Sequence, residues 1–404
     1  MIRNSTHTYG AITKTFHWVT ALLIITLFPL GAIANRLPYE TSEQLAQKAW
    51  LFSLHKTLGV TLFAVAVLRI LWTLTQKKPG LLNANKPLES WAAETVHWLL
   101  YGALVIVPLS GWIHHAATSG FAPIWPPIST YIGQSLPLIP KSETIAHLFA
   151  GIHWVSTKVL LLALLLHIAG AIKHHVIDKD LTLKRMLPGH TAPDILPTQT
   201  HSRTPLITAV VVYIAVIAAG VAMGVTGKDD NDATPKLAEV SSGWTVQSGT
   251  LNLTIKQLGS DVTGEFQDWT AAIEFTEQPD ANDLHGDVEV TIAIGSLKLG
   301  SVSGQAMGAD FFAVEAFPNA VFAAPITSTD GNYTADGTLT IKGNEVPVSL
   351  PFTLDIAGDT AVMQGQATIN RTNFNIGETY PDESSLGFDV QIEVNLTAVR
   401  SDQP

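Results

Sequence analysis

The sequence of 404 residues contains no cysteine, and its second half is nearly free of histidine and poor in basic residues. The absence of cysteine excludes disulfides, Cys-ligated zinc, iron–sulfur clusters and thiol-attached c-type haem. Residues 228–404 carry 7 Lys and Arg against 26 Asp and Glu, whereas residues 1–227 carry 16 against 8. Thirteen of the 14 histidines precede residue 204. These contrasts indicate two physically different units, and the acidic second unit argues against nucleic-acid binding.

The first half contains five apolar segments, each long enough for the ~20 residues that cross a bilayer as a helix. They are approximately residues 16–35, 53–75, 91–115, 147–172 and 205–226. The first run lacks a small-residue cleavage pattern, so we expect it to remain as a helix. The last contains no charged residue. The segment Gly227–Pro235 is expected to be a linker.

The orientation of these helices follows from Lys and Arg in the short loops. The loops expected on one side, together with the N-terminal segment, hold most of these cations, including Lys77, Lys78 and Lys86. The loops on the other side hold only Arg36, Lys48 and Lys141. We therefore expect a cytoplasmic N-terminus, and five crossings then place the acidic half on the opposite side.

The second half changes to a period of two from about Glu239. Apolar residues alternate with polar ones in 251–255, 288–294 and 388–396, and Lys342-Gly343-Asn344 is a typical hairpin turn. Alternation of this kind places one face of each strand in a core and the other in water. Many such strands predict an antiparallel β-barrel or sandwich.

Two histidines of the fourth apolar helix have an informative spacing. His153 and His167 are 14 residues apart, about 21 Å along a helix and nearly on the same face. Neutral imidazole is a common axial ligand of haem iron, and ionisable groups within a membrane are rare without a function. One helix therefore offers an imidazole near each membrane surface, which suits two stacked haems.

Depth in the membrane then selects the partners of these two histidines. With a cytoplasmic N-terminus, His17 at the start of the first helix and His167 near the end of the fourth lie at the cytoplasmic side. His55 near the start of the second helix and His153 near the start of the fourth lie at the opposite side. We therefore expect the pairs His17–His167 and His55–His153. A single membrane histidine is more often a structural hydrogen-bonding residue, and this remains the alternative for each. Other histidines that compete less well as ligands are His97, His114, His115, His147, His174 and His175.

Two cations in the second helix are candidate partners of anionic groups. Arg69 lies 14 residues after His55 on the same face, where a haem propionate or a quinone head group would suit its guanidinium. The alternative is that Arg69 extends to the cytoplasmic surface. Lys56 is adjacent to His55, and it either serves the propionates of the second haem or anchors the helix at the interface.

The first half resembles the bacterial cytochrome b561 family. The resemblance rests on TKTFHW (13–18), SLHKTLG (53–59), LRI (68–70), HWVSTKVLLLALLLHIAGAIKHHVIDKD (153–180) and LKRMLP (183–188). It implies two haems b held by four histidines at His17, His55, His153 and His167, a link to the quinone pool, and location in the bacterial inner membrane. A superoxide-oxidising, quinone-reducing activity is known in the family, and the sequence does not decide whether this chain is such an enzyme.

The second half resembles the YceI-like family of lipocalin-like periplasmic barrels that bind isoprenoid chains. The resemblance rests on GWTVQSGTLNLTI (243–255), VTGEFQDWTAAIEF (262–275), ADFFAVEAFPNAVF (309–322) and GTLTIKGNEVPVSLPF (337–352). Because the barrel is fused to a half that resembles a quinone-linked cytochrome, we expect it to hold a quinone or a related polyisoprenoid lipid. Seven aromatic residues either line such a cavity or fill a core: Phe266, Trp269, Phe275, Phe311, Phe312, Phe317 and Phe322.

We therefore predict a multidomain membrane protein with an all-α transmembrane four-helix haem bundle, a fifth tethering helix and an all-β antiparallel lipocalin-like barrel. The expected domains are residues 1–190, a connector with the fifth helix and linker in 191–235, and the periplasmic barrel in 236–404. The predicted function is electron transfer between the quinone pool and an unidentified periplasmic redox partner, with superoxide as one candidate donor. The alternative is a membrane-tethered carrier of isoprenoid lipid whose cytochrome acts as a redox sensor or anchor.

Overall fold

A computed structural model describes residues 1–118, 122–189, 191–193, 197, 202–224, 236–281, 283–329 and 331–401. The chain divides into two compact units. The first comprises Met1–Leu37, Ala49–Thr118 and Pro123–Asp229, and the second comprises Pro38–Lys48, Ser119–Ala122 and Asp230–Pro404. The expected linker, residues 227–235, lies outside the described residues.

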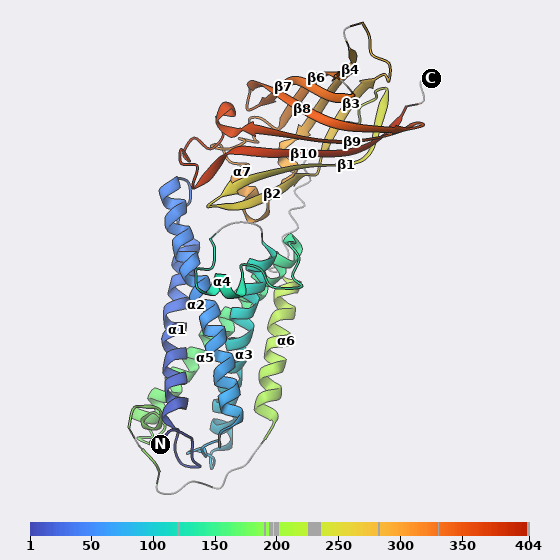
Figure 1. The fold of residues 1–404 in the computed structure, drawn as a ribbon. Helices are drawn as coiled ribbons and strands as arrows, with labels where there is room; N and C mark the ends of the chain where they lie inside the picture. Colours follow the sequence, from blue (N-terminus) through green and yellow to red (C-terminus); the bar gives the residue numbers. More distant parts are fainter. Residues whose placement is uncertain are drawn as a thin grey trace. The chain divides into compact units, whose positions relative to one another are not determined.

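The first unit is helical (Figure 1). Its helices are α1 (Ala11–Arg36), α2 (Ser42–Leu74), α3 (Pro87–Ala117), α4 (Ile128–Ile132), α5 (Glu143–Val176), the 3₁₀ helix η1 (Lys184–Met186) and α6 (Thr204–Ala222), with the first turns of α2 assigned to the second unit. Five of them, α1, α2, α3, α5 and α6, are long and apolar enough to cross a membrane. This confirms the five predicted spans. Apolar side chains such as Leu22 and Leu162 are exposed on these helices, as expected for surfaces that face lipid.

The fifth span, α6, packs against α3 and α5 rather than only tethering the barrel (Figure 1). The Tyr213 hydroxyl donates a hydrogen bond to the Leu99 carbonyl at 2.8 Å. The Tyr213 ring covers Gly102, where a Cβ atom would lie only 2.7 Å from the ring. The absence of a side chain at Gly102 thus allows α6 to approach α3 closely.

The second unit is an antiparallel β-barrel. Its strands are β1 (Trp244–Gln257), β2 (Ser260–Phe266), β3 (Trp269–Phe275), β4 (Leu284–Ala293), β5 (Leu297–Lys298), β6 (Asn319–Thr329), β7 (Asn332–Ile341), β8 (Asn344–Ala357), β9 (Thr360–Asn370) and β10 (Leu386–Arg400). The short helices η2 (Ile294–Ser296), η3 (Gly300–Val302) and α7 (Ser303–Ala306) lie between β4 and β6, and η4 (Arg371–Phe374) follows β9. The predicted fold class is confirmed.

The barrel closes because β10 pairs with both β9 and β1. The closed ring runs β1, β3, β4, β6, β7, β8, β9, β10 and back to β1, while β2 and β5 extend it beside β1. The β7–β8 turn is formed by Lys342 and Gly343, both with positive φ, as the sequence predicted. Closure removes the free edges of the ring and leaves one continuous interior face.

Candidate functional site

The two histidines of α5 each face a histidine on another helix. The start of α5 is fixed by Ser142, whose side chain accepts a hydrogen bond from the Ile145 amide. The ring centroids of His153 and His55 of α2 are 6.4 Å apart, and those of His167 and His17 of α1 are 6.1 Å apart. The structure therefore brings together the histidines that depth in the membrane paired.

The spacing of both pairs fits haem iron with two axial histidines. A metal–imidazole bond is about 2 Å long, and each ring centroid lies about 1 Å behind its nitrogen, so imidazoles on opposite sides of one iron have centroids about 6 Å apart. Both pairs have this separation. In the described part of the chain, α1 and α2 make few close backbone contacts with the other helices, whereas α3 and α5 pack tightly.

His153 is held in one orientation by α3. Its Nδ1 lies 2.8 Å from the Val107 carbonyl, which fixes the hydrogen on Nδ1 and leaves Nε2 as the ligating nitrogen. Gly111, one turn later, permits this approach, because a Cβ atom there would lie 3.0 Å from the ring. The histidine spacing alone did not identify this glycine.

His55 has an equivalent environment on α1. A Cβ atom at Gly31 would lie 2.7 Å from the His55 ring. The Leu27 carbonyl, one turn before Gly31, lies toward the ring, although Nδ1 has no full hydrogen bond to the described residues. Gly31 on α1 and Gly111 on α3 thus leave space for the rings of His55 and His153. A larger side chain at either position would occupy that space.

The His17–His167 pair has a third histidine beside it. The His97 ring centroid is 5.1 Å from that of His167, closer than two rings on opposite sides of one iron. His97 Nδ1 lies 2.7 Å from the Ala93 carbonyl in its own helix. This geometry favours His17 over His97 as the partner of His167.

Arg69 also lies near this pair. Its guanidinium lies 5.5 Å from the centroid of the Tyr101 ring, and its charge acts on His17, His97 and His167. A cation at this position is suited to an anionic group held next to the histidines. Its contact with a propionate or a quinone stays a prediction.

Lys56 belongs to α2, and its side chain extends toward His115 of α3. Its Nζ is 3.2 Å from Nδ1 of His115, whose Nε2 is 3.4 Å from Oε1 of Gln134. Nδ1 of the neighbouring His114 lies 2.8 Å from the Ala146 carbonyl of α5. His114 and His115 therefore have structural partners, which agrees with their low rank as iron ligands.

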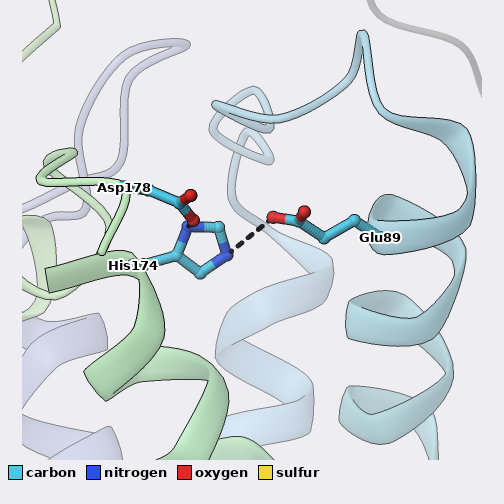
Figure 2. A group of neighbouring side chains, drawn as sticks. All are labelled: Glu89, His174 and Asp178. Atoms are coloured by element: carbon cyan, nitrogen blue, oxygen red, sulfur yellow. Dashed lines mark ion pairs between the residues drawn. The ribbon is translucent and has the colours of Figure 1, made fainter. Parts of the chain in front are cut away.

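His174 belongs to an ion-pair network that joins α3 to the end of α5. Figure 2 shows His174 between Glu89 and Asp178, with Nε2 at 3.4 Å from Oε1 of Glu89 and Nδ1 at 3.1 Å from Oδ2 of Asp178. These three residues have the composition of a metal site. However, the Lys173 ammonium lies 2.9 Å from Glu89 and 2.8 Å from Asp178. Its hydrogen bond holds the pKa of Asp178 below the ordinary value, so the cluster already contains its cation.

The segment after α5 closes one end of the helical unit. Lys14 and Trp18 of α1 donate hydrogen bonds to the carbonyls of Leu187 and Met186 at 2.7 and 2.9 Å. Arg185 in this segment is 4% exposed, and its Nη1 donates to the Gly80 carbonyl at 2.9 Å.

Arg185 is a candidate anion-binding residue that the sequence did not distinguish from other loop cations. Its Nε and Nη2 are buried and have no hydrogen-bond partner among the described residues, and its guanidinium lies 5.3 Å from the Tyr9 ring centroid. Burial lowers its pKa. A buried guanidinium with unused donors is suited to a carboxylate or phosphate.

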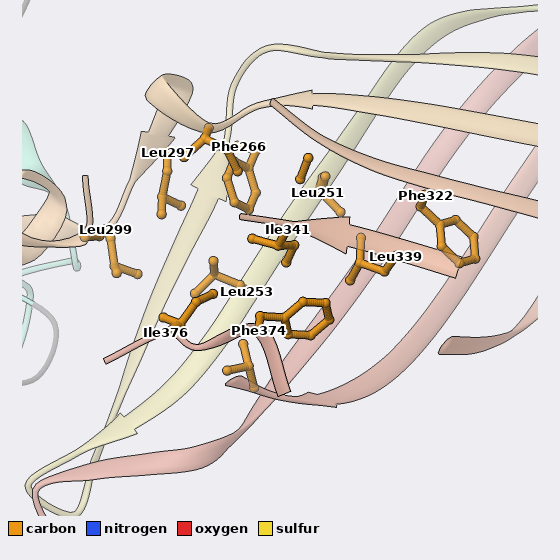
Figure 3. Packing of buried hydrophobic residues seen from close by; sticks show 14 of the residues in the cluster. Leu251, Leu253, Phe266, Leu297, Leu299, Phe322, Leu339, Ile341, Phe374 and Ile376 are labelled. Carbon is orange, nitrogen blue, oxygen red and sulfur yellow. The ribbon is translucent and has the colours of Figure 1, made fainter. Parts of the chain in front are cut away.

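The barrel encloses an apolar cavity of about 260 Å³. Six of the seven aromatic residues considered from the sequence line it, whereas Phe317 does not and is 38% exposed. Phe266 and Phe322 belong to the packed core as well, and Figure 3 shows them with Leu251, Leu253 and Leu339 inside the barrel. Side chains on the inner face of the barrel thus pack against one another as a core, and they also surround a cavity.

Comparison with known proteins gives a separate match for each half of the chain. Residues 8–189 match the sequence model of prokaryotic cytochrome b561. "Cytochrome b561 homolog 2" of Escherichia coli is 33% identical over 189 residues, which are 46% of this chain and 93% of that protein. "Probable superoxide oxidase CybB" of Yersinia pestis is 23% identical over 184 residues, or 45% of this chain and 96% of that protein.

Residues 244–398 match the sequence model of the YceI-like domain. Among solved structures, Burkholderia cenocepacia BcnA is similar at 28% identity, with 37% of this chain and 96% of that one covered and a TM-score of 0.35. The Campylobacter jejuni YceI protein is 17% identical, with 44% and 98% covered and a TM-score of 0.31.

Proposed function

Because the chain belongs to the prokaryotic cytochrome b561 family and carries a YceI-like lipid-binding domain, we propose that it transfers electrons between the quinone pool and a periplasmic donor or acceptor. Cytochromes b561 are haem b proteins of membranes, and haem supplies one-electron redox chemistry when bound. The observation that carries the proposal is the spacing of about 6 Å in each of two histidine pairs.

In this proposal the chain holds two haems b. His17 with His167 would hold the iron of one haem, and His55 with His153 would hold the iron of the other. The Val107 carbonyl orients His153 by accepting a hydrogen bond from Nδ1 of the imidazole. Arg69 and Lys56 supply positive charge toward the anionic edges of the two groups. The apolar helix surfaces exclude water from both sites, which lets the protein set their potentials.

The proposed orientation places the N-terminus in the cytoplasm and the barrel in the periplasm of a bacterial inner membrane. The distribution of Lys and Arg between the loops supports it. The His55–His153 pair is then near the periplasmic surface and the His17–His167 pair near the cytoplasmic one. In this arrangement the barrel binds an isoprenoid lipid, and it supplies quinone or shields it from water.

Rapid mixing of the purified full chain with ubiquinol-2 tests the electron-transfer proposal. We expect ubiquinol-2 to reduce the bound haem, with a change in the α band, and ubiquinone-2 to reoxidise it. The His17→Ala/His167→Ala double variant, which lacks one of the two histidine pairs, serves as the control for absorbance changes that do not come from the His17–His167 site. Absence of haem reduction by ubiquinol-2, and of reoxidation by ubiquinone-2, would contradict a link to quinone.

A second candidate is oxidation of superoxide coupled to quinone reduction. It is favoured by the similarity to the Yersinia relative with that name and by the cations Arg36, Lys48 and Lys56 on the proposed periplasmic side. We expect superoxide to reduce the haem of the full chain, and superoxide dismutase to abolish the reduction. Haem that stays oxidised while superoxide is supplied would rule this activity out.

The remaining alternative makes the barrel a tethered carrier of isoprenoid lipid and the cytochrome a sensor or anchor. A chain that ends near Gly224, after α6, keeps both histidine pairs and the packing of α6 but lacks the barrel. Electron exchange with quinone at the full rate in that chain would make the barrel auxiliary to the redox chemistry. A large loss of rate would couple the two units.

Replacement of Arg69 by methionine should lower one of the two haem potentials. A positive charge near a haem favours its reduced form, because reduction adds an electron, and a unit charge at a partly buried site corresponds to a shift on the order of 50 mV. Redox titration of the α band would resolve the two sites. Replacement of the exposed Arg400 of the barrel by methionine provides the control, since it lies in the other unit. Equal haem potentials in the wild type and the Arg69 variant would mean that Arg69 does not act on either haem.

A further inference from the structure

One inward position of the barrel wall is polar where the strand pattern calls for an apolar residue. Along β1 the side chains of Leu251, Leu253 and Ile255 face the cavity, and Gln257 follows two residues later on the same face. Gln257 is 6% exposed. Its Oε1 is fully buried and has no hydrogen-bond partner among the described residues. An unpaired amide oxygen in an apolar site costs about 1–3 kcal/mol.

The buried arginine in the wall cannot serve a ligand, because its donors are already used. Arg371 Nε donates to the Gly387 carbonyl, Nη1 to Ile376 and Gly377, and Nη2 to Tyr380 and Leu386, at 2.6 to 3.1 Å. A guanidinium has five N–H donors, and all five have a carbonyl here. The cavity therefore offers no free guanidinium donor to a phosphate.

The Tyr380 hydroxyl is occupied as well. It donates to the carbonyl of Tyr39, which belongs to the same compact unit, and accepts a hydrogen bond from Nε2 of Gln305 at 2.8 Å. Gln257 thus contributes an uncharged acceptor, without a partner among the described residues, to a wall that is otherwise mostly apolar. Trp244, at the other end of β1, also lines the cavity, so residues at both ends of a strand about 40 Å long border the space that a hydrocarbon tail would occupy.

We propose that Gln257 is the head-group subsite of the barrel, and that it selects a neutral isoprenoid lipid whose head donates a hydroxyl hydrogen bond, that is, a polyprenol or a hydroquinone. This rests on the proposed function of the barrel as an isoprenoid-binding domain. An ether or another head group without O–H leaves Oε1 of Gln257 unpaired, and a phosphorylated head brings negative charge to a cavity in which the donors of Arg371 are already used.

Binding of geranylgeraniol and of its methyl ether to the purified full chain tests the proposal, because the two differ in the hydroxyl donor. Titration followed by native mass spectrometry of the detergent-released protein gives both affinities. We expect the alcohol to bind at least about fivefold more tightly, the value of one buried neutral hydrogen bond. In Gln257→Met, which keeps side-chain length, we expect the two affinities to become equal and the ether to bind at least as well as in the wild type.

The affinities of further ligands identify the lipid that supplies the hydroxyl group and define the results that would contradict the proposal. Tighter binding of ubiquinol-2 than of geraniol, which has the same number of isoprene units, assigns the site to hydroquinones, and the reverse order assigns it to polyprenols. Equal affinities of alcohol and ether in the wild type, or tighter binding of geranylgeranyl phosphate than of the alcohol, would overturn the hydroxyl subsite while leaving lipid binding intact. Failure of all these ligands to bind would instead reject the isoprenoid function itself. The wild-type comparison decides even if the variant does not fold.

Discussion

Replacement of His153 by alanine should remove one of two haems b, and replacement of His167 should remove the other. Each of these residues faces a single histidine at the separation of two axial ligands, 6.4 Å for His153 and 6.1 Å for His167. Loss of one imidazole would leave the iron of that site with a single protein ligand in an apolar environment, which favours release of the haem. The pyridine haemochrome assay should give a haem-to-protein ratio of two for the wild type and about one for each variant.

The control for these variants lies on the same helix. His175 is exposed near the end of α5, so His175→Ala should retain both haems. A wild-type ratio of one, or ratios that do not change in the His153 and His167 variants, would mean that the 14-residue spacing does not reflect two haems. His97, whose ring lies 5.1 Å from that of His167, would then be the first ligand to reconsider.

Replacement of Arg371 by methionine should destabilise the barrel by about 4 kcal/mol while leaving haem absorbance unchanged. Arg371 is 2% exposed and donates to five carbonyls in the segment that follows η4 and at the start of β10. Methionine fills a similar volume but leaves these carbonyls without partners. Urea unfolding of the full chain, followed by the β-sheet circular dichroism signal, would give the change in the free energy of unfolding.

An exposed arginine of the same barrel provides the matched control. Arg400 pairs with Glu277 at 2.9 Å, and both side chains are accessible to solvent, so Arg400→Met should cost less than about 1 kcal/mol. An Arg371 variant as stable as the Arg400 variant would mean that the segment rearranges or admits water to satisfy its carbonyls. A loss of haem absorbance together with the barrel signal would mean that the two units unfold cooperatively.

Much of the architecture could be predicted from the sequence, because its signals are local and periodic. Five apolar runs set the number of membrane-spanning helices, and the period of two along 251–255 and 388–396 set the strands and their inward faces. The helical repeat alone places His153 and His167 on one face of α5, and depth is enough to choose His17 and His55 as their neighbours. The turn at Lys342 and Gly343 was likewise encoded by two adjacent residues.

Tertiary structure decided everything that depends on which surfaces meet. Gly31 and Gly111 become informative only when α1 and α3 bring them against His55 and His153, and α6 proved to pack on α3 through Tyr213 because Gly102 leaves space there. The sequence does not distinguish the roles of Arg185 and Arg371, yet one keeps unused donors and the other has none. Sequence periodicity fixes which face of an element a residue occupies, but the hydrogen-bond partners of a buried group come from segments far apart in the chain, so only the folded arrangement determines them.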